Sequence, residues 1–174
     1  MSVVCGVDAS PAAAVAARVA GRLARHLGAR LVLVHVRAPI PHVAPPPGTS
    51  PPSEETLEAY RDERRRRALD LLEGVAAAAV DGHAELRAPE GDVAAVLAAE
   101  ARDAGAEFVV VGSQGRGMVL SAVLGSVSAA LVRSAPCPVV VVPPTAARAQ
   151  AGLWGVAPER SHPAAAVPAR HAAS

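Results

Sequence analysis

The chain has 174 residues, of which 51% are apolar and only 2% aromatic, and its formal net charge is +1. This length suits one domain with a hydrophobic core, and the near-neutral charge gives no basic surface that would favour DNA, RNA or an anionic membrane. All 17 basic residues are Arg, and the lack of Lys excludes a Walker-type P-loop, protein kinase chemistry and Schiff-base catalysis.

The first part of the chain predicts a strand, a helix and a second strand. Val3–Val7 is an apolar run that predicts the first strand. Ser10 and Pro11 are residue types preferred at an N-cap and at the first helical position. Apolar residues then recur at helical spacing up to Gly28, which suits the position after a helix end. Leu31–Val36 is a nearly continuous apolar run, typical of a strand buried on both faces.

A proline-rich segment, residues 38–53, predicts a surface loop, because proline lacks the N–H donor that helices and central strands need. A long helix is then predicted from Ser53 to about Ala79. The four consecutive arginines of this helix, Arg64–Arg67, have acidic residues one turn away. We therefore interpret them as a solvated helix face and not as a nucleic-acid contact.

The second part of the chain repeats the alternation of strand and helix. His83–Arg87 is short and polar and predicts an edge strand, while Asp92 predicts the N-cap of a third helix. Phe108–Val111 and Val139–Val142 predict two further strands, with a fourth helix from about Ser126 between them. Such alternation implies right-handed crossovers, and hence an open α/β fold with a parallel sheet covered by helices on both faces.

The segment after Phe108–Val111 is the most informative part of the chain. The apolar run breaks into Gly112, Gly115 and Gly117, and Gly125-Ser126 then opens the fourth helix. A strand, a glycine-rich loop and a helix N-terminus in this order bring backbone N–H groups together around a phosphate. The glycines allow close approach, and the helix adds unpaired donors and a partial positive charge. The segment therefore predicts a phosphate site.

Together these marks resemble the universal stress protein family. The resemblance is carried by Gly112-x-x-Gly115, nine residues and then Gly125-Ser126, by Asp8-Ala9-Ser10, by His35-Val36, and by Ala135-Pro136-Cys137-Pro138 before a valine strand. It covers residues 1–143, which we assign to one domain, and residues 144–174 are expected to form a disordered Ala- and Pro-rich tail. The family implies a Rossmann-like fold of the adenine nucleotide alpha-hydrolase type, with five parallel strands in the order 3-2-1-4-5.

In that strand order a ligand crevice lies between strands one and four, where the winding direction reverses. Asp8 ends the first strand and Gly112 the fourth, so two independent features point into the same crevice. Asp8 can accept hydrogen bonds from both ribose hydroxyls, whereas Ser10 is better placed to cap the helix. With the family correspondence, the candidate nucleotide-binding residues are Gly6, Val7, Asp8, Val36, Val111, Gly112, Gln114, Gly115, Arg116, Gly125, Ser126 and Val127.

The resemblance implies that Val36 meets the adenine through its backbone and side chain, and that Gly6, Val7 and Val111 line the adenosine end. The glycines and Ser126 would hold the phosphates through backbone N–H groups. Arg116 either adds a charge-assisted bond to the terminal phosphates or points to solvent.

The expected ligand is ATP, with Mg²⁺ helping to neutralise the phosphates because Gln114 is uncharged. No residue of the motif has an evident role as a base, and the six histidines lack metal-ligand spacing. We therefore expect an ATP-binding stress-response regulator with little or no hydrolysis, not an enzyme beyond at most a slow ATPase.

One alternative is an interaction module that keeps the fold without nucleotide. Ala9 stands where the family commonly has Gly and would be strained if the turn requires a positive φ. An ATP pyrophosphatase-like enzyme would need a Ser-Gly-Gly-x-Asp-Ser loop after the first strand, which Val7–Pro11 does not provide.

The last expectations concern the cellular compartment and the oligomeric state. The sequence shows no secretory signal and no run of about 20 apolar residues that would span a bilayer. Cys5 and Cys137 make no disulfide framework. We expect a cytoplasmic protein, and the resemblance suggests a homodimer through Val139–Val142, whose edge would otherwise be bare.

Overall fold

The structure is a computed structural model that describes residues 1–40, 50–80, 82–113, 124–143 and 145–146. Three candidate site residues, Gln114, Gly115 and Arg116, lie outside the described residues. So do most of the proline-rich segment and all but two residues of the expected tail.

Five parallel strands form one sheet in the order β3-β2-β1-β4-β5. The central strand β1 pairs with β2 through Val4 and Val32 and with β4 through Val4 and Val109. The predicted fold class is thereby confirmed, including the edge position of the third strand. The strands are β1 (Ser2–Gly6), β2 (Arg30–Val34), β3 (Ala84–Arg87), β4 (Ala106–Gly112) and β5 (Val139–Val142).

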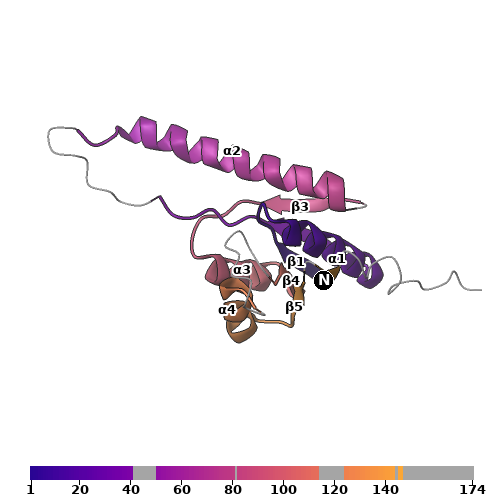
Figure 1. Cartoon of the computed structure of the whole chain (residues 1–174). Helices are drawn as coiled ribbons and strands as arrows, with labels where there is room; N and C mark the ends of the chain where they lie inside the picture. Colours follow the sequence, from indigo (N-terminus) through magenta and orange to yellow (C-terminus); the bar gives the residue numbers. More distant parts are fainter. Residues whose placement is uncertain (41–49, 81, 114–123, 144, 147–174) are drawn as a thin grey trace, which may run out of the picture.

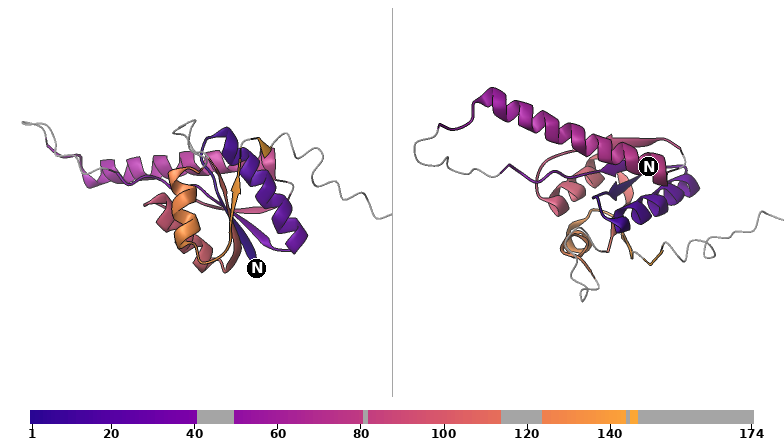
Figure 2. Two further views of the ribbon diagram at one scale, coloured as in Figure 1. Left: turned by 60° about the horizontal axis from the view of Figure 1, so that its bottom comes forward. Right: turned by 45° about the horizontal axis from the view of Figure 1, so that its top comes forward.

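Helices cover both faces of the sheet (Figures 1 and 2). One face packs against α1 (Pro11–Leu27) and the second half of α2 (Glu54–Ala79), the other against α3 (Val93–Asp103) and α4 (Ser126–Ser134). Because successive strand residues point to opposite faces, neighbouring residues of β1 enter different cores. Each core is built mainly of Ala, Val and Leu.

Local capping signals set the helix ends. The Ser10 hydroxyl accepts a hydrogen bond from the Ala13 N–H at 3.2 Å, and Gly28 ends α1 with a φ of +61°. Ser53 and Asp92 cap α2 and α3 in the same way. The caps predicted at Ser10, Gly28 and Asp92 and the helix start predicted at Ser53 are confirmed.

The longest helix, α2, reaches well beyond the sheet (Figure 1). Its fully buried residues, Ala68 and Leu72, both lie in its second half. The first half is therefore held by polar contacts and not by a core. No helix of the described ranges is long and apolar enough to cross a membrane.

Candidate functional site

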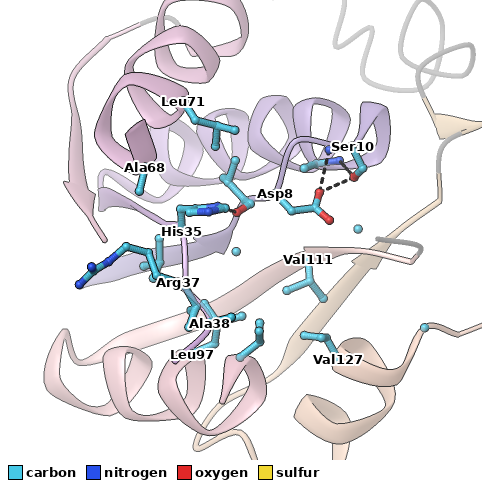
Figure 3. Close-up of a pocket in the computed structure, with 18 of the residues that line it drawn as sticks. Asp8, Ser10, His35, Arg37, Ala38, Ala68, Leu71, Leu97, Val111 and Val127 are labelled. Carbon is cyan, nitrogen blue, oxygen red and sulfur yellow. Dashed lines mark hydrogen bonds between the residues drawn. The ribbon is translucent and has the colours of Figure 1, made fainter. Parts of the chain in front are cut away.

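A cavity of about 1020 Å³ opens at the carboxyl ends of β1, β2 and β4, where the winding of the sheet reverses (Figure 3). The structure brings nine of the twelve candidate residues to its wall, and the other three lie outside the described residues. The nine are Gly6, Val7, Asp8, Val36, Val111, Gly112, Gly125, Ser126 and Val127.

Asp8 stands at the turn from β1 into α1. Its carboxylate oxygen Oδ1 accepts hydrogen bonds from the backbone N–H of Ser10, at 3.0 Å, and from the Ser10 hydroxyl (Figure 3). Ser10, in turn, is the N-cap of α1. Asp8 therefore orients the capping residue without being the cap itself, and it remains part of the cavity wall.

Ala9, between these two residues, is exposed and unstrained. No non-glycine residue of the described ranges has a positive φ. The turn after β1 thus does not require glycine in this chain, and the strain considered for Ala9 does not occur.

The start of α4 forms the opposite end of the cavity. Gly125 is its N-cap and, having no side chain, makes no side-chain cap hydrogen bond to the first helical N–H groups. The Gly125 N–H donates to the Ser113 carbonyl oxygen at 2.8 Å, and a Cβ on Gly125 would lie 3.0 Å from that oxygen. The glycine thus lets the helix start close to the end of β4. An uncapped helix start offers N–H donors and a partial positive charge to an anion.

The sequence interpretation missed a second wall of the cavity, which α2 provides. Tyr60, Glu63, Arg64 and Arg67 line it. The Arg64 guanidinium lies 5.8 Å from the centre of the Tyr60 ring and donates to the Ala38 carbonyl oxygen at 2.6 Å. The helical spacing of Tyr60, Arg64 and Arg67 is the signal that could have shown a shared face.

The arginine run therefore has two roles. Glu63 pairs with Arg66 at 2.9 Å and with Arg67 at 2.8 Å, as the solvated-face interpretation expects, and these hydrogen bonds hold the pKa of Glu63 below its usual value. Arg64 instead turns inward, where its side chain is 23% exposed and lies 4.0 Å from Glu90. Glu90 also pairs with Arg37 at 3.4 Å and so joins α2 to the segments after β2 and β3.

The lower wall of the cavity is apolar. Leu97, Val111 and Val127 lie together on the side of α3 and α4, across the opening from Ala68 and Leu71 of α2 (Figure 3). Polar groups at the two ends and apolar walls between them suit a ligand with a flat apolar part and an anionic part. The described residues contain no group of three or more side chains that could hold a metal ion.

This geometry defines an open α/β protein with a ligand cavity at the reversal of winding. Residues 1–143 match the model of the universal stress protein family. The chain is 36% identical over 144 residues to a universal stress protein of Mycolicibacterium smegmatis, covering 83% of this chain and 46% of that protein. The chain belongs to the universal stress protein family.

The matches to two further relatives cover nearly the whole length of each relative. A universal stress protein of Thermus aquaticus is 33% identical over 141 residues, which are 81% of this chain and 97% of that protein. A crystal structure of a universal stress protein in complex with cAMP has a TM-score of 0.55 at 25% identity and covers 82% of this chain and 96% of that one. The chain spans about half the length of its mycobacterial relatives.

Proposed function

We propose that this protein binds ATP in the cavity and acts as a stress-response regulator whose state depends on nucleotide occupancy. One observation carries the proposal: Asp8 at the end of β1 and the uncapped start of α4 line the same cavity. An ionised carboxylate suits ribose hydroxyls, and a helix N-terminus suits phosphates. The related structure with cAMP supports an adenine nucleotide as the ligand.

Binding with little or no hydrolysis is part of the proposal. Hydrolysis requires a group that orients water and another that stabilises the developing charge. Three described groups of the wall could act as a base, and each has another role: Asp8 serves the ribose in this proposal, His35 bonds to the Val7 carbonyl oxygen, and Glu63 pairs with Arg66 and Arg67. Mg²⁺, where it takes part, would be held mainly by the phosphates of the ligand.

Regulation requires that ATP bind two states of the protein unequally, since equal affinity shifts no equilibrium. We place the affected surface at the mouth of the cavity, where α2 and the start of α4 approach the ligand. A homodimer formed through β5 would contain two such cavities, one in each copy.

The experiment is to denature the freshly purified full chain and to chromatograph the small molecules that it releases. ATP or ADP from the wild type, and much less from Asp8→Ala, would support the proposal. Asp8→Asn keeps an acceptor for Ser10 and tests the charge separately, and Asp103→Ala on the exposed end of α3 is the control for loss of a carboxylate.

A protein that releases no nucleotide and gives no heat with Mg-ATP or cAMP in calorimetry would overturn the proposal. The fold would then act as an interaction module without nucleotide.

A further inference from the structure

The ladder between β1 and β2 ends in an unusual way. Val7 N–H donates to the Val34 carbonyl oxygen at 2.8 Å, which continues the register Gly6 to Val34. In a parallel ladder the next bond would run from the Val36 N–H to the Val7 carbonyl oxygen. Instead, the Val7 oxygen accepts a hydrogen bond from the His35 ring, whose Nδ1 lies 2.8 Å away.

The direction of this bond fixes one hydrogen of the ring. A carbonyl oxygen can only accept, so Nδ1 of His35 carries the hydrogen. That N–H is present both in the neutral Nδ1–H tautomer and in the imidazolium ion. The bond to Val7 therefore persists in either form.

The peptide groups of Val36 are left without a partner among the described residues, although Val36 lines the cavity. The residues on either side of it hold this segment to β3: His35 N–H donates to the Arg87 oxygen at 2.9 Å, and Arg37 N–H to the Pro89 oxygen at 2.8 Å. Since peptide groups alternate in direction along an extended chain, those of Val36 face the β1 side. There β1 has ended and the cavity begins.

The family resemblance already implies that the backbone of Val36 meets the adenine. We propose that His35 is a positioning residue for this contact: by occupying the Val7 carbonyl oxygen, it keeps the Val36 N–H and C=O open to the base of the nucleotide. This inference rests on the proposed function. The 6-amino group of adenine is a donor and its N1 an acceptor, which match the Val36 carbonyl oxygen and N–H. Hypoxanthine presents the reverse order at these two positions, so the same pair discriminates against it.

The first test needs no nucleotide. Amide hydrogen exchange by NMR on the full chain should show a rapidly exchanging Val36 N–H in the wild type. His35→Leu lacks the ring donor, so the Val36 N–H should donate to the Val7 carbonyl oxygen and become protected from exchange. His35→Asn places an N–H at the position of Nδ1 and should keep the exchange rapid.

The second test compares the affinities for ATP and inosine triphosphate. The wild type should prefer ATP, and His35→Leu should lose about tenfold of that preference, the size of one or two neutral hydrogen bonds. His35→Asn should retain it. His26→Leu is the matched control, because the Nδ1 of His26 also contacts a carbonyl oxygen at 2.8 Å, that of Arg22, on the exposed side of α1.

The outcomes separate this inference from the proposed function. If the wild type prefers ATP and His35→Leu keeps both the preference and the rapid exchange, the role of His35 is overturned while ATP binding stands. If the wild type binds neither nucleotide, the proposed function and base recognition both fail. His35→Asn behaving like His35→Leu would likewise overturn the role of the Nδ1 donor.

Discussion

The side chain of Leu97 occupies the space that a Cβ atom on Gly6 would need. Such a Cβ would lie 2.9 Å from Cδ1 of Leu97 and 3.2 Å from Cγ1 of Val111. Leu97 belongs to α3, is 2% exposed, and also lines the cavity. The missing side chain of Gly6 therefore lets α3 pack close to the end of β1, at the floor of the site.

We expect Gly6→Ala to lower the free energy of unfolding by about 1–2 kcal/mol, because Leu97 must leave its place in a packed core. Urea denaturation would measure the change. Gly74→Ala is the control: a Cβ on this exposed glycine within α2 meets nothing within 4 Å, so we expect a gain of about 0.5–1 kcal/mol. A Gly6→Ala protein as stable as the wild type would show that Leu97 relaxes without cost.

Ser2 and Ala104 join the start of β1 to the end of α3. The Ser2 hydroxyl is fully buried and donates to the Ala104 carbonyl oxygen at 2.7 Å. Ser2→Ala leaves that buried oxygen without this donor and should cost about 1–2 kcal/mol in thermal or urea unfolding. Ser134→Ala removes a hydroxyl that bonds to the Ala130 oxygen on the surface of α4 and should change little. Equal effects of the two substitutions would contradict this account.

Because of Cys5, the free energy of unfolding should fall as the pH rises into the alkaline range. Burial raises the pKa of its thiol from 9.0 to about 12. Between these values the unfolded chain holds fewer protons than the folded one, so stability falls as pH rises. At pH 10 the folded protein should have lost about 1.4 kcal/mol from this thiol relative to pH 7.

The contribution of Cys5 is measured by comparing the wild type with Cys5→Ala at two pH values. The free energy of unfolding of the wild type minus that of Cys5→Ala, taken at pH 7 and again at pH 10, isolates the thiol from other titrating groups. Cys137→Ala should give a smaller decline, since that thiol is only partly buried and its pKa is raised less. A difference that does not vary with pH would show that Cys5 ionises as readily in the folded chain as in the unfolded chain.

The strand predicted at Leu31–Val36 ends earlier, because β2 runs from Arg30 to Val34. The helix ends, in contrast, could be predicted because their signals are local. Ser10, Gly28, Ser53 and Asp92 each act on N–H or C=O groups within a few residues of themselves. Strand order has no such local signal, and here it came from the family resemblance. The convergence of Asp8 and Gly112 on one cavity followed once that order was supplied.

The helical spacing of α2 could show that Tyr60, Arg64 and Arg67 share a face, but not that this face lines the cavity. The tertiary contacts of Arg64 and His35 could not be predicted, because both partners lie far away in the sequence. Arg64 turns inward to the Ala38 oxygen, 26 residues away, while Arg66 and Arg67 pair with Glu63 on the same helix. His35 bonds to the Val7 oxygen, 28 residues away. In each case the residue type allowed a surface or core role, and only the tertiary contact decides between them.

The last strand gives the prediction about assembly. Val109 N–H donates to the Pro138 oxygen at 3.0 Å, and Ser113 N–H to the Val142 oxygen at 2.8 Å. Since parallel pairing uses alternate residues, the peptide groups of Val139 and Val141 face away from β4, at the edge of the sheet. An apolar edge of this kind favours pairing with another chain.

We therefore expect Val141→Lys to convert a homodimer into a monomer, because the Val141 side chain is only partly buried within one chain and a second copy paired at this edge would further bury the added charge. Light scattering on the full chain measures the mass, and circular dichroism shows whether each variant is folded. Ala77→Lys, on the exposed side of α2, carries the same charge change and should leave the mass unaltered. A folded Val141→Lys protein with the mass of the wild-type dimer would place the interface elsewhere.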